Sequence, residues 1–177
     1  MEERTVYILL TRSGTCFSRL IRLATQDSYT HASIGLDGPS GPFYSFARKH
    51  AHFALPAGLV EETVTVHRRT VPCCLYELTV NEDTFLRLRC RLDAMYAQRE
   101  AYHYNLLGTL ACWFHLSLPR RNHYFCSQFV AAVLEECGAV RLPKSPALLR
   151  PADFCHVDAL RPVHQGFLEG ISATSPA

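Results

Sequence analysis

The chain has 177 residues, of which 48% are hydrophobic and 19% are charged, and 18 basic against 16 acidic residues leave a net charge of +2. These proportions indicate one globular domain with a hydrophobic core, and they exclude a disordered or fibrous chain. The nearly balanced charge gives no reason to expect nucleic acid as a partner.

The N-terminal sequence and the eight cysteines favour a cytoplasmic protein. The apolar run at residues 6–10 is too short for a secretory signal peptide, and no stretch approaches the roughly 18 apolar residues of a membrane span. We therefore expect the cysteines to be thiols rather than disulfides. Cys73 and Cys74 are adjacent and no Cys-x-x-Cys pair occurs, so we expect neither a structural zinc site nor a cofactor.

The first half of the chain is rich in strand signals. The β-forming composition and the turn at Asp37-Gly38-Pro39 predict strands at residues 5–11, 31–36, 42–47, 63–67 and 74–80. A helical period predicts a helix at 17–24. Residues 50–59, which contain Pro56 and Gly58, have the composition of an irregular loop.

Three helices are expected in the second half. Asn81 is a good N-cap for a helix that runs to about Glu100, with Phe85, Leu88, Leu92, Met95 and Tyr96 on its buried face. The apolar residues 104–116 predict a second helix, in a region where Leu110, Trp113, Phe114 and Leu118 are expected in the core. The third spans 127–137, with Phe129, Val130, Val133 and Leu134 inward, and stops at Gly138.

The strands and helices fall in separate blocks, which favours an α+β fold in a single domain of residues 1–164. The Gly-, Ser- and Ala-rich residues 165–177 are expected to form a flexible tail. Cys90, Cys112 and Cys137 lie in the predicted helices and are expected to be small core residues.

Cys126 is the cysteine whose position favours catalysis. It lies where the helix at 127–137 begins, so its thiol faces free N–H groups and the positive end of the helix dipole. The same amides, in a first turn kept polar by Ser127 and Gln128, can receive the oxyanion formed when a carbonyl is attacked. A buried structural cysteine is the alternative interpretation.

A thiol nucleophile needs a base, and His31 is the best placed of the nine histidines. An imidazole at the entry of the strand at 31–36 can reach a helix N-terminus packed on the same sheet and take the thiol proton. His123 is closer to Cys126 in sequence, but three residues upstream in an extended segment its side chain usually points elsewhere. A purely structural histidine is the alternative.

Four segments carry a resemblance to a known family. They are Thr11-Arg-Ser-Gly-Thr, Tyr29-Thr-His-Ala-Ser-Ile-Gly-Leu-Asp, Tyr102-His-Tyr-Asn-Leu-Leu-Gly and Tyr124-Phe-Cys-Ser-Gln-Phe-Val-Ala. With the histidine first on a strand and the cysteine later at a helix start, this order resembles the circularly permuted NlpC-type papain-like cysteine peptidases, in particular the YiiX-like and YebB-like group. Together with the strand before the first segment and the helix that the last one opens, the resemblance covers residues 5 to about 138.

The resemblance implies a permuted papain-like fold, in which an antiparallel sheet packs against helices. It also implies a third polar residue on the strand after the histidine, often Glu or His, that orients the imidazole. Ser45 is the nearest polar match here, although a hydroxyl adds no negative charge. Tyr29, Tyr104 and Ser127 are candidates for the substrate or oxyanion site, as is Gly14 in the loop after the first strand.

Three functions follow as hypotheses. The first is a thiol hydrolase that cleaves a peptide or acyl-amino bond through a thioester on Cys126, with His31 as the general base. The second is an acyltransferase or thioesterase acting on lipid-like acyl groups, because Tyr104-Asn-Leu-Leu resembles the approach to the cysteine in lecithin-retinol acyltransferase relatives. The third is a binding module of the same fold without catalysis, supported by the missing acidic residue. The partner is in each case a small peptide, amide or acyl compound.

Overall fold

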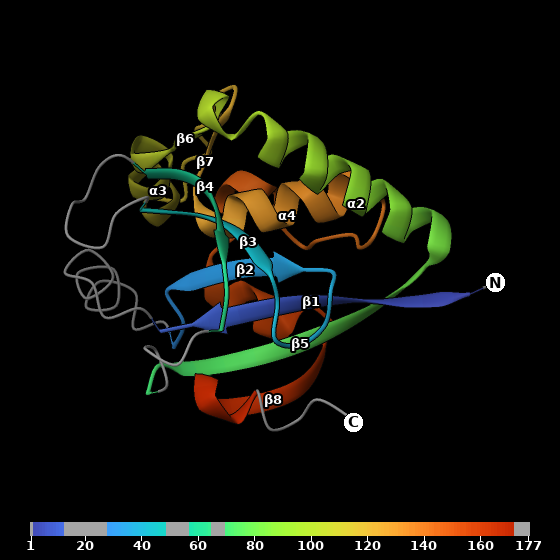
Figure 1. The fold of residues 1–177 in the computed structure, drawn as a ribbon. Coiled ribbons are helices and arrows are strands. Elements are labelled where there is room, and N and C mark those ends of the chain that lie inside the picture. Colours follow the sequence, from blue (N-terminus) through green and yellow to red (C-terminus); the bar gives the residue numbers. More distant parts are fainter. Residues whose placement is uncertain (1, 13–27, 49–56, 65–69, 172–177) are drawn as a thin grey trace.

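The computed structural model describes residues 2–12, 28–48, 57–64 and 70–171, which form an α+β fold around an eight-stranded sheet (Figure 1). The strands are β1 (Glu3–Thr11), β2 (His31–Gly35), β3 (Phe43–Arg48), β4 (Ala57–Glu62), β5 (Pro72–Asn81), β6 (His103–Tyr104), β7 (His123–Tyr124) and β8 (Arg161–Phe167). Their order in the sheet is β7-β6-β4-β3-β2-β1-β5-β8, and all neighbours are antiparallel except β6 and β7. The helices are α2 (Glu82–Ala97), α3 (Leu106–Trp113) and α4 (Cys126–Glu136).

Four of the predicted strands are confirmed, namely those at 5–11, 31–36, 42–47 and 74–80, which correspond to β1, β2, β3 and β5. β1 and β3 are rich in β-branched or aromatic residues, and β1 pairs with β2 on one side and with β5 on the other. The predicted helix at 17–24 lies outside the described residues.

The fourth strand lies elsewhere than the sequence predicts. β4 spans Ala57–Glu62, so the expected loop at 50–59 contains the first half of a strand, and the expected strand at 63–67 begins after β4 has ended. Ala57 and Gly58 have low strand propensity, whereas the alternation from Thr63 onward resembles a strand. Strand pairing sets the position of β4, because this strand bonds along its whole length to β3 and through Gly58 to β6.

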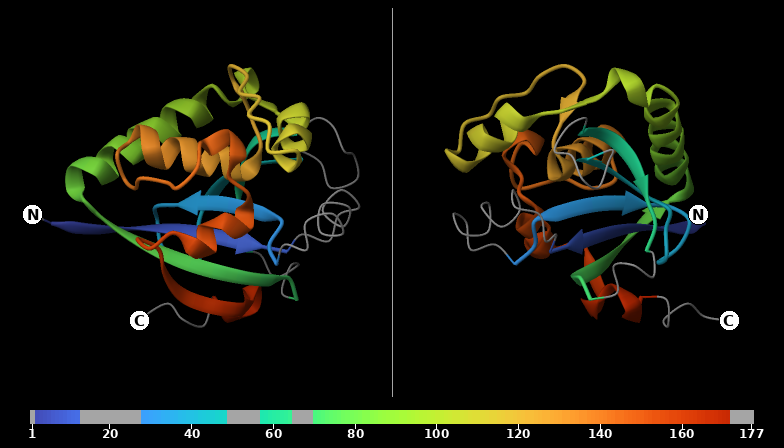
Figure 2. Two further views of the ribbon diagram at one scale, coloured as in Figure 1. Left: turned by 180° about the vertical axis from the view of Figure 1, so that it is seen from behind. Right: turned by 60° about the vertical axis from the view of Figure 1, so that its left-hand side comes forward.

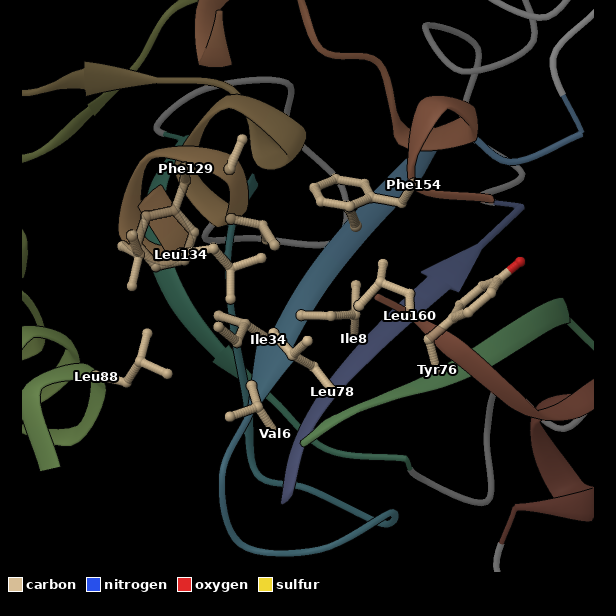
Figure 3. Packing of buried hydrophobic residues seen from close by; sticks show 14 of the residues in the cluster. Val6, Ile8, Ile34, Tyr76, Leu78, Leu88, Phe129, Leu134, Phe154 and Leu160 are labelled. Carbon is tan, nitrogen blue, oxygen red and sulfur yellow. The ribbon is translucent and has the colours of Figure 1, made fainter. Parts of the chain in front are cut away.

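The main hydrophobic core lies between the sheet and the helices α2 and α4 (Figures 1 and 3). Alternate residues of β1, among them Val6 and Ile8, point into this core together with Ile34 of β2. Phe129 of α4 packs against them and is fully buried.

A second, smaller core covers the opposite face of the sheet. Leu9 of β1 and Leu75 of β5 pack there against Leu168 and Ile171, which follow β8. The predicted flexible tail is therefore wrong for residues 165–171, because residues 165–167 belong to β8 and Ile171 is fully buried. The reason is tertiary, since a sheet with apolar residues on both faces needs a cover on each. Residues 172–177 lie outside the described part.

Helix α2 begins at the predicted cap. The Asn81 side chain accepts a hydrogen bond from the Thr84 N–H at 2.8 Å, and Glu82 and Asp83 occupy the first turn. The helix ends at Ala97, three residues before the predicted end, and continues as a short 3₁₀ turn. Cys90 is exposed on this helix, so its predicted place in the core is wrong, whereas Cys112 and Cys137 are buried as expected.

We expect Asn81→Ala to lower the free energy of unfolding by about 1 kcal/mol, because the Thr84 N–H then loses its acceptor at the helix start. Urea unfolding followed by circular dichroism measures the change. Asp83→Ala, in the same turn but outside the cap, is the comparison variant. An equal loss in both variants would contradict a specific contribution of the cap.

Helix α4 confirms its predicted orientation. Phe129, Val130, Val133 and Leu134 are each at most 1% exposed, and the helix packs on β2 and β3. Gly138 follows the helix with φ of 69°, the left-handed conformation that ends many helices.

Helix α3 contradicts the expected burial of its region. It is shorter than the predicted 104–116, and Leu110 is 49% exposed, Phe114 70% and Leu118 43%. The Trp113 side chain lies outside the described part. None of the helices in the described ranges is both long and apolar enough to span a bilayer.

Candidate active site

The nucleophile candidate Cys126 is the first residue of α4. The first intrahelical hydrogen bond runs from the Phe129 N–H to the Phe125 carbonyl at 2.9 Å, so the N–H groups of residues 126–128 have no acceptor within the helix. The Cys126 side chain is 6% exposed. The thiol therefore lies at the positive end of an anchored helix, as the sequence predicts.

Two side chains hold the first turn of α4 in place. The Ser127 hydroxyl donates to the Leu149 carbonyl oxygen at 2.6 Å, and the Gln128 Oε1 accepts from the Phe125 N–H at 3.4 Å. Both residues are buried. The Ser127 hydroxyl is thus engaged in positioning the helix, and its main-chain N–H is the group that can serve an oxyanion.

His31 is the first residue of β2, and its imidazole interacts with a carboxylate and with a thiol. Its Nε2 lies 2.9 Å from Oε2 of Glu62, the last residue of β4, and the imidazole is also hydrogen-bonded to the Cys126 thiol. Because Nε2 is engaged by Glu62, Nδ1 is the nitrogen left for the thiol. The side chains of His31 and Glu62 are 14% and 21% exposed, so water screens the pair only in part.

The surroundings of His31 favour its charged form. Burial opposes protonation, but the Glu62 carboxylate and the Cys126 sulfur outweigh it and raise the pKa of His31 well above the usual value. An imidazole in this position holds a proton taken from a thiol, and the carboxylate stabilises the resulting cation. The three groups form the order thiol, imidazole, carboxylate that nucleophilic catalysis requires.

Glu62 is the residue that sequence reasoning missed. The predicted loop at 50–59 and strand at 63–67 left it between two elements, with no assigned face or neighbour. In the structure β4 is two positions from β2 in the sheet, with β3 between them. An acidic residue at the end of a strand is common, so only the pairing of β4 could have identified it.

Ser45, the expected orienting residue, has another partner. It lies on β3, is fully buried, and its hydroxyl donates to the Ala32 carbonyl oxygen at 2.6 Å. This bond ties β3 to β2 beside His31. The side chain that bonds to the His31 imidazole, in the place where the sequence suggested Ser45, is that of Glu62.

Tyr104, a candidate for the substrate or oxyanion site, interacts electrostatically with Cys126. Burial, followed by the Cys126 sulfur, raises the pKa of Tyr104, while a hydrogen bond with Thr109 of α3 acts in the opposite direction. A protonated phenol beside the thiol can donate a hydrogen bond to a substrate oxygen.

Tyr29 lies in a different environment. It is buried in the main core, and burial together with the neighbouring thiols of Cys74 and Cys155 raises the pKa of Tyr29 to about 12. Its hydrogen bond is to Cys74. Gly14, the fourth candidate for the substrate site, lies outside the described residues.

The seven cysteines in the described part of the chain are all free, and no cluster of three His, Cys, Asp or Glu residues suited to a metal ion occurs there. Comparison with protein-family models, curated proteins and solved structures finds no match to this chain.

Proposed function

We propose that the protein is a cysteine hydrolase of the amidase or peptidase class, in which Cys126 is the nucleophile, His31 the general base and Glu62 the residue that orients the base. One observation carries the proposal: the imidazole is hydrogen-bonded to the thiol and to the carboxylate, with a His31 Nε2 to Glu62 Oε2 distance of 2.9 Å. A structural histidine needs one partner, whereas a catalytic base needs both.

The reaction follows from these positions. Nδ1 of His31 takes the thiol proton, and the Cys126 sulfur attacks the carbonyl carbon of the substrate, whose oxygen becomes an oxyanion near the first-turn N–H groups of α4. The carbon–nitrogen bond then breaks as His31 returns the proton to the leaving amine. Water, deprotonated by His31, attacks the thioester, which releases the acid and restores the thiol.

The arrangement supports the resemblance to circularly permuted NlpC-type enzymes as part of this proposal. The histidine begins a strand, the cysteine begins a later helix, and a glutamate completes the set. One feature departs from the expected pattern, since the glutamate is not on β3 but on β4. Glu62 also removes the main support for a binding module without catalysis, namely the absence of an acidic residue.

Acyl transfer is the second candidate function, and the exposed apolar residues of α3 favour it. This helix begins two residues after Tyr104, and the Cys126 sulfur acts electrostatically on the phenol of that tyrosine, so Tyr104 links the apolar helix to the candidate site. A transferase would form the same thioester and pass the acyl group to an acceptor other than water.

The proposal predicts that iodoacetamide at neutral pH modifies Cys126 faster than Cys90, although Cys126 is buried and Cys90 is exposed. Exposure alone predicts the reverse order, so the measurement isolates activation by His31. Peptide mapping by mass spectrometry gives both rates in one sample. p-Nitrophenyl acetate then serves as a generic acyl donor, with an acetyl adduct and turnover expected in the wild type and neither in Cys126→Ala.

Cys90→Ala is the matched control, and we expect it to retain turnover. Faster modification of Cys90, or unchanged turnover in Cys126→Ala, would contradict the proposal. A stable acetyl adduct that an added amine or alcohol releases faster than water would favour acyl transfer over hydrolysis.

A further inference from the structure

Helix α3 turns its apolar residues toward solvent. We name as the α3 apolar surface the exposed residues of this helix and of the segment that follows it: Leu106, Leu107, Leu110, Phe114, Leu116 and Leu118. Each is between 43% and 70% exposed. Figure 2 shows α3, in yellow, at the periphery of the molecule. Several large apolar side chains exposed within one short segment mark an interaction site.

Buried polar contacts hold the helix in this orientation. Asn105 is fully buried, and its side chain accepts from the Gly108 N–H at 2.9 Å and donates to the Leu118 carbonyl oxygen at 3.2 Å. Thr109, also buried, donates to the Asn105 carbonyl oxygen at 3.0 Å. The bonds to Gly108 and Thr109 are local to the helix start, whereas the Asn105 main-chain N–H donates to the Tyr124 carbonyl oxygen of β7 at 2.9 Å. Rotating the leucines inward would disturb this contact and the one with Leu118, so their exposure is built into the fold.

The chain segment that carries the α3 apolar surface has charges of one sign. The sequence contains no acidic residue from Ala101 to Leu134, whereas exposed Arg120 and Arg121 directly follow the last apolar residues. Apolar side chains bordered by arginines complement a bilayer with anionic headgroups, where the arginines meet phosphates and the apolar side chains enter the acyl boundary.

We propose that the α3 apolar surface docks the protein onto anionic phospholipid membranes from one side, without spanning them. The inference does not depend on the proposed chemistry, because it rests on the orientation of α3 and on the charge beside it. It has a consequence for that chemistry, since Tyr104 is hydrogen-bonded to Thr109 of α3, and the Cys126 sulfur acts electrostatically on its phenol. A membrane bound at α3 would therefore lie on an element that Tyr104 links to the candidate site.

Vesicle co-sedimentation tests the docking, with Cys126→Ala as the background so that no acyl chemistry contributes. We expect binding to phosphatidylcholine vesicles that contain phosphatidylserine and about tenfold weaker binding to phosphatidylcholine alone. Leu107→Glu/Phe114→Glu should abolish binding, because carboxylates cannot enter an anionic interface. Arg120→Glu/Arg121→Glu should weaken vesicle binding about tenfold or more. Added salt should weaken the vesicle binding of the protein that keeps both arginines.

Leu86→Glu is the matched control, because Leu86 is 49% exposed on α2, and this variant should bind as tightly as the background protein. Circular dichroism checks that every variant keeps its fold. Absence of vesicle binding, or equal binding by Leu107→Glu/Phe114→Glu, would overturn the proposal. A concentration-dependent dimer that the same double substitution dissociates, without vesicle binding, would assign the surface to a second copy of the chain instead.

Discussion

His31→Ala is expected to lower the turnover of p-nitrophenyl acetate by about 10²- to 10⁴-fold, the range that a positioned general base contributes. In the proposed reaction the imidazole accepts the Cys126 proton, and it is hydrogen-bonded to that thiol and to the Glu62 carboxylate. Without it the sulfur keeps its proton and the leaving group receives none. Steady-state kinetics at neutral pH, with intact mass for the acetyl adduct, measures the loss.

His123→Ala is the control for this prediction. His123 is the histidine nearest to Cys126 in sequence, but its Nδ1 lies 2.8 Å from the Arg121 carbonyl oxygen and its ring packs against His103. We expect its removal to leave turnover within about twofold of the wild type, in keeping with a residue outside the transition state. An equal loss in both variants would show that His31 has no special role.

Glu62→Gln is expected to lower turnover by about 10²-fold, because an amide can keep the hydrogen bond to Nε2 but cannot stabilise the imidazolium. The same substitution should lower the pKa of His31, which the carboxylate raises in the wild type. Nitrogen-15 NMR of the imidazole measures this pKa directly. A merely structural glutamate would change stability without moving the His31 titration.

The pH dependence of stability provides a second readout. Because the folded pKa of His31 is raised, its contribution to folding is complete below the ordinary histidine pKa of about 6.5 and is lost as the pH rises through the folded value. The wild type should therefore exceed Glu62→Gln in unfolding free energy by more at about pH 6 than at about pH 9.

Glu61→Gln removes the same charge from the neighbouring, exposed position of β4 and is the matched control. It should change neither the His31 titration nor turnover. Ser45→Ala extends the comparison, because the Ser45 hydroxyl bonds to the Ala32 carbonyl rather than to the imidazole. A His31 pKa that falls in Ser45→Ala and not in Glu62→Gln would return the orienting role to Ser45.

Several elements were predictable because their signals are local. The cap at Asn81 satisfies an N–H only three residues away, and the apolar period of α4 concerns residues on one helix face. The place of Cys126 at the start of α4 follows from the same period. Each of these depends on interactions within one turn or one strand, which composition and spacing record.

The position of β4 was not predictable in the same way. Its first residues, Ala57 and Gly58, are weak strand formers, and they are held by pairing with Ala47 and Arg48 of β3 and with His103 of β6. His103 is distant in sequence from both strands of the hairpin. A local pattern cannot contain such a pairing, so the strand was misplaced and Glu62 at its end was missed.

Helix α3 shows the converse failure. Its apolar composition predicts burial, but the buried side is occupied by Gly108, Thr109 and Cys112, and Asn105 fixes the helix through hydrogen bonds at both ends of the segment. Composition reports how apolar a segment is, and it does not report which face its neighbours cover.

The sequence by itself therefore determined the α+β class, the strands around β1, the helix start that carries Cys126, and the pairing of this cysteine with His31 as a hypothesis. Only the tertiary structure decided that Glu62 completes the site, that residues 165–171 cover the second face of the sheet, and that α3 presents leucines to solvent. The physical reason is the same in all three cases. Hydrogen bonds and burial between segments far apart in the chain outweigh the local propensities that a sequence pattern records.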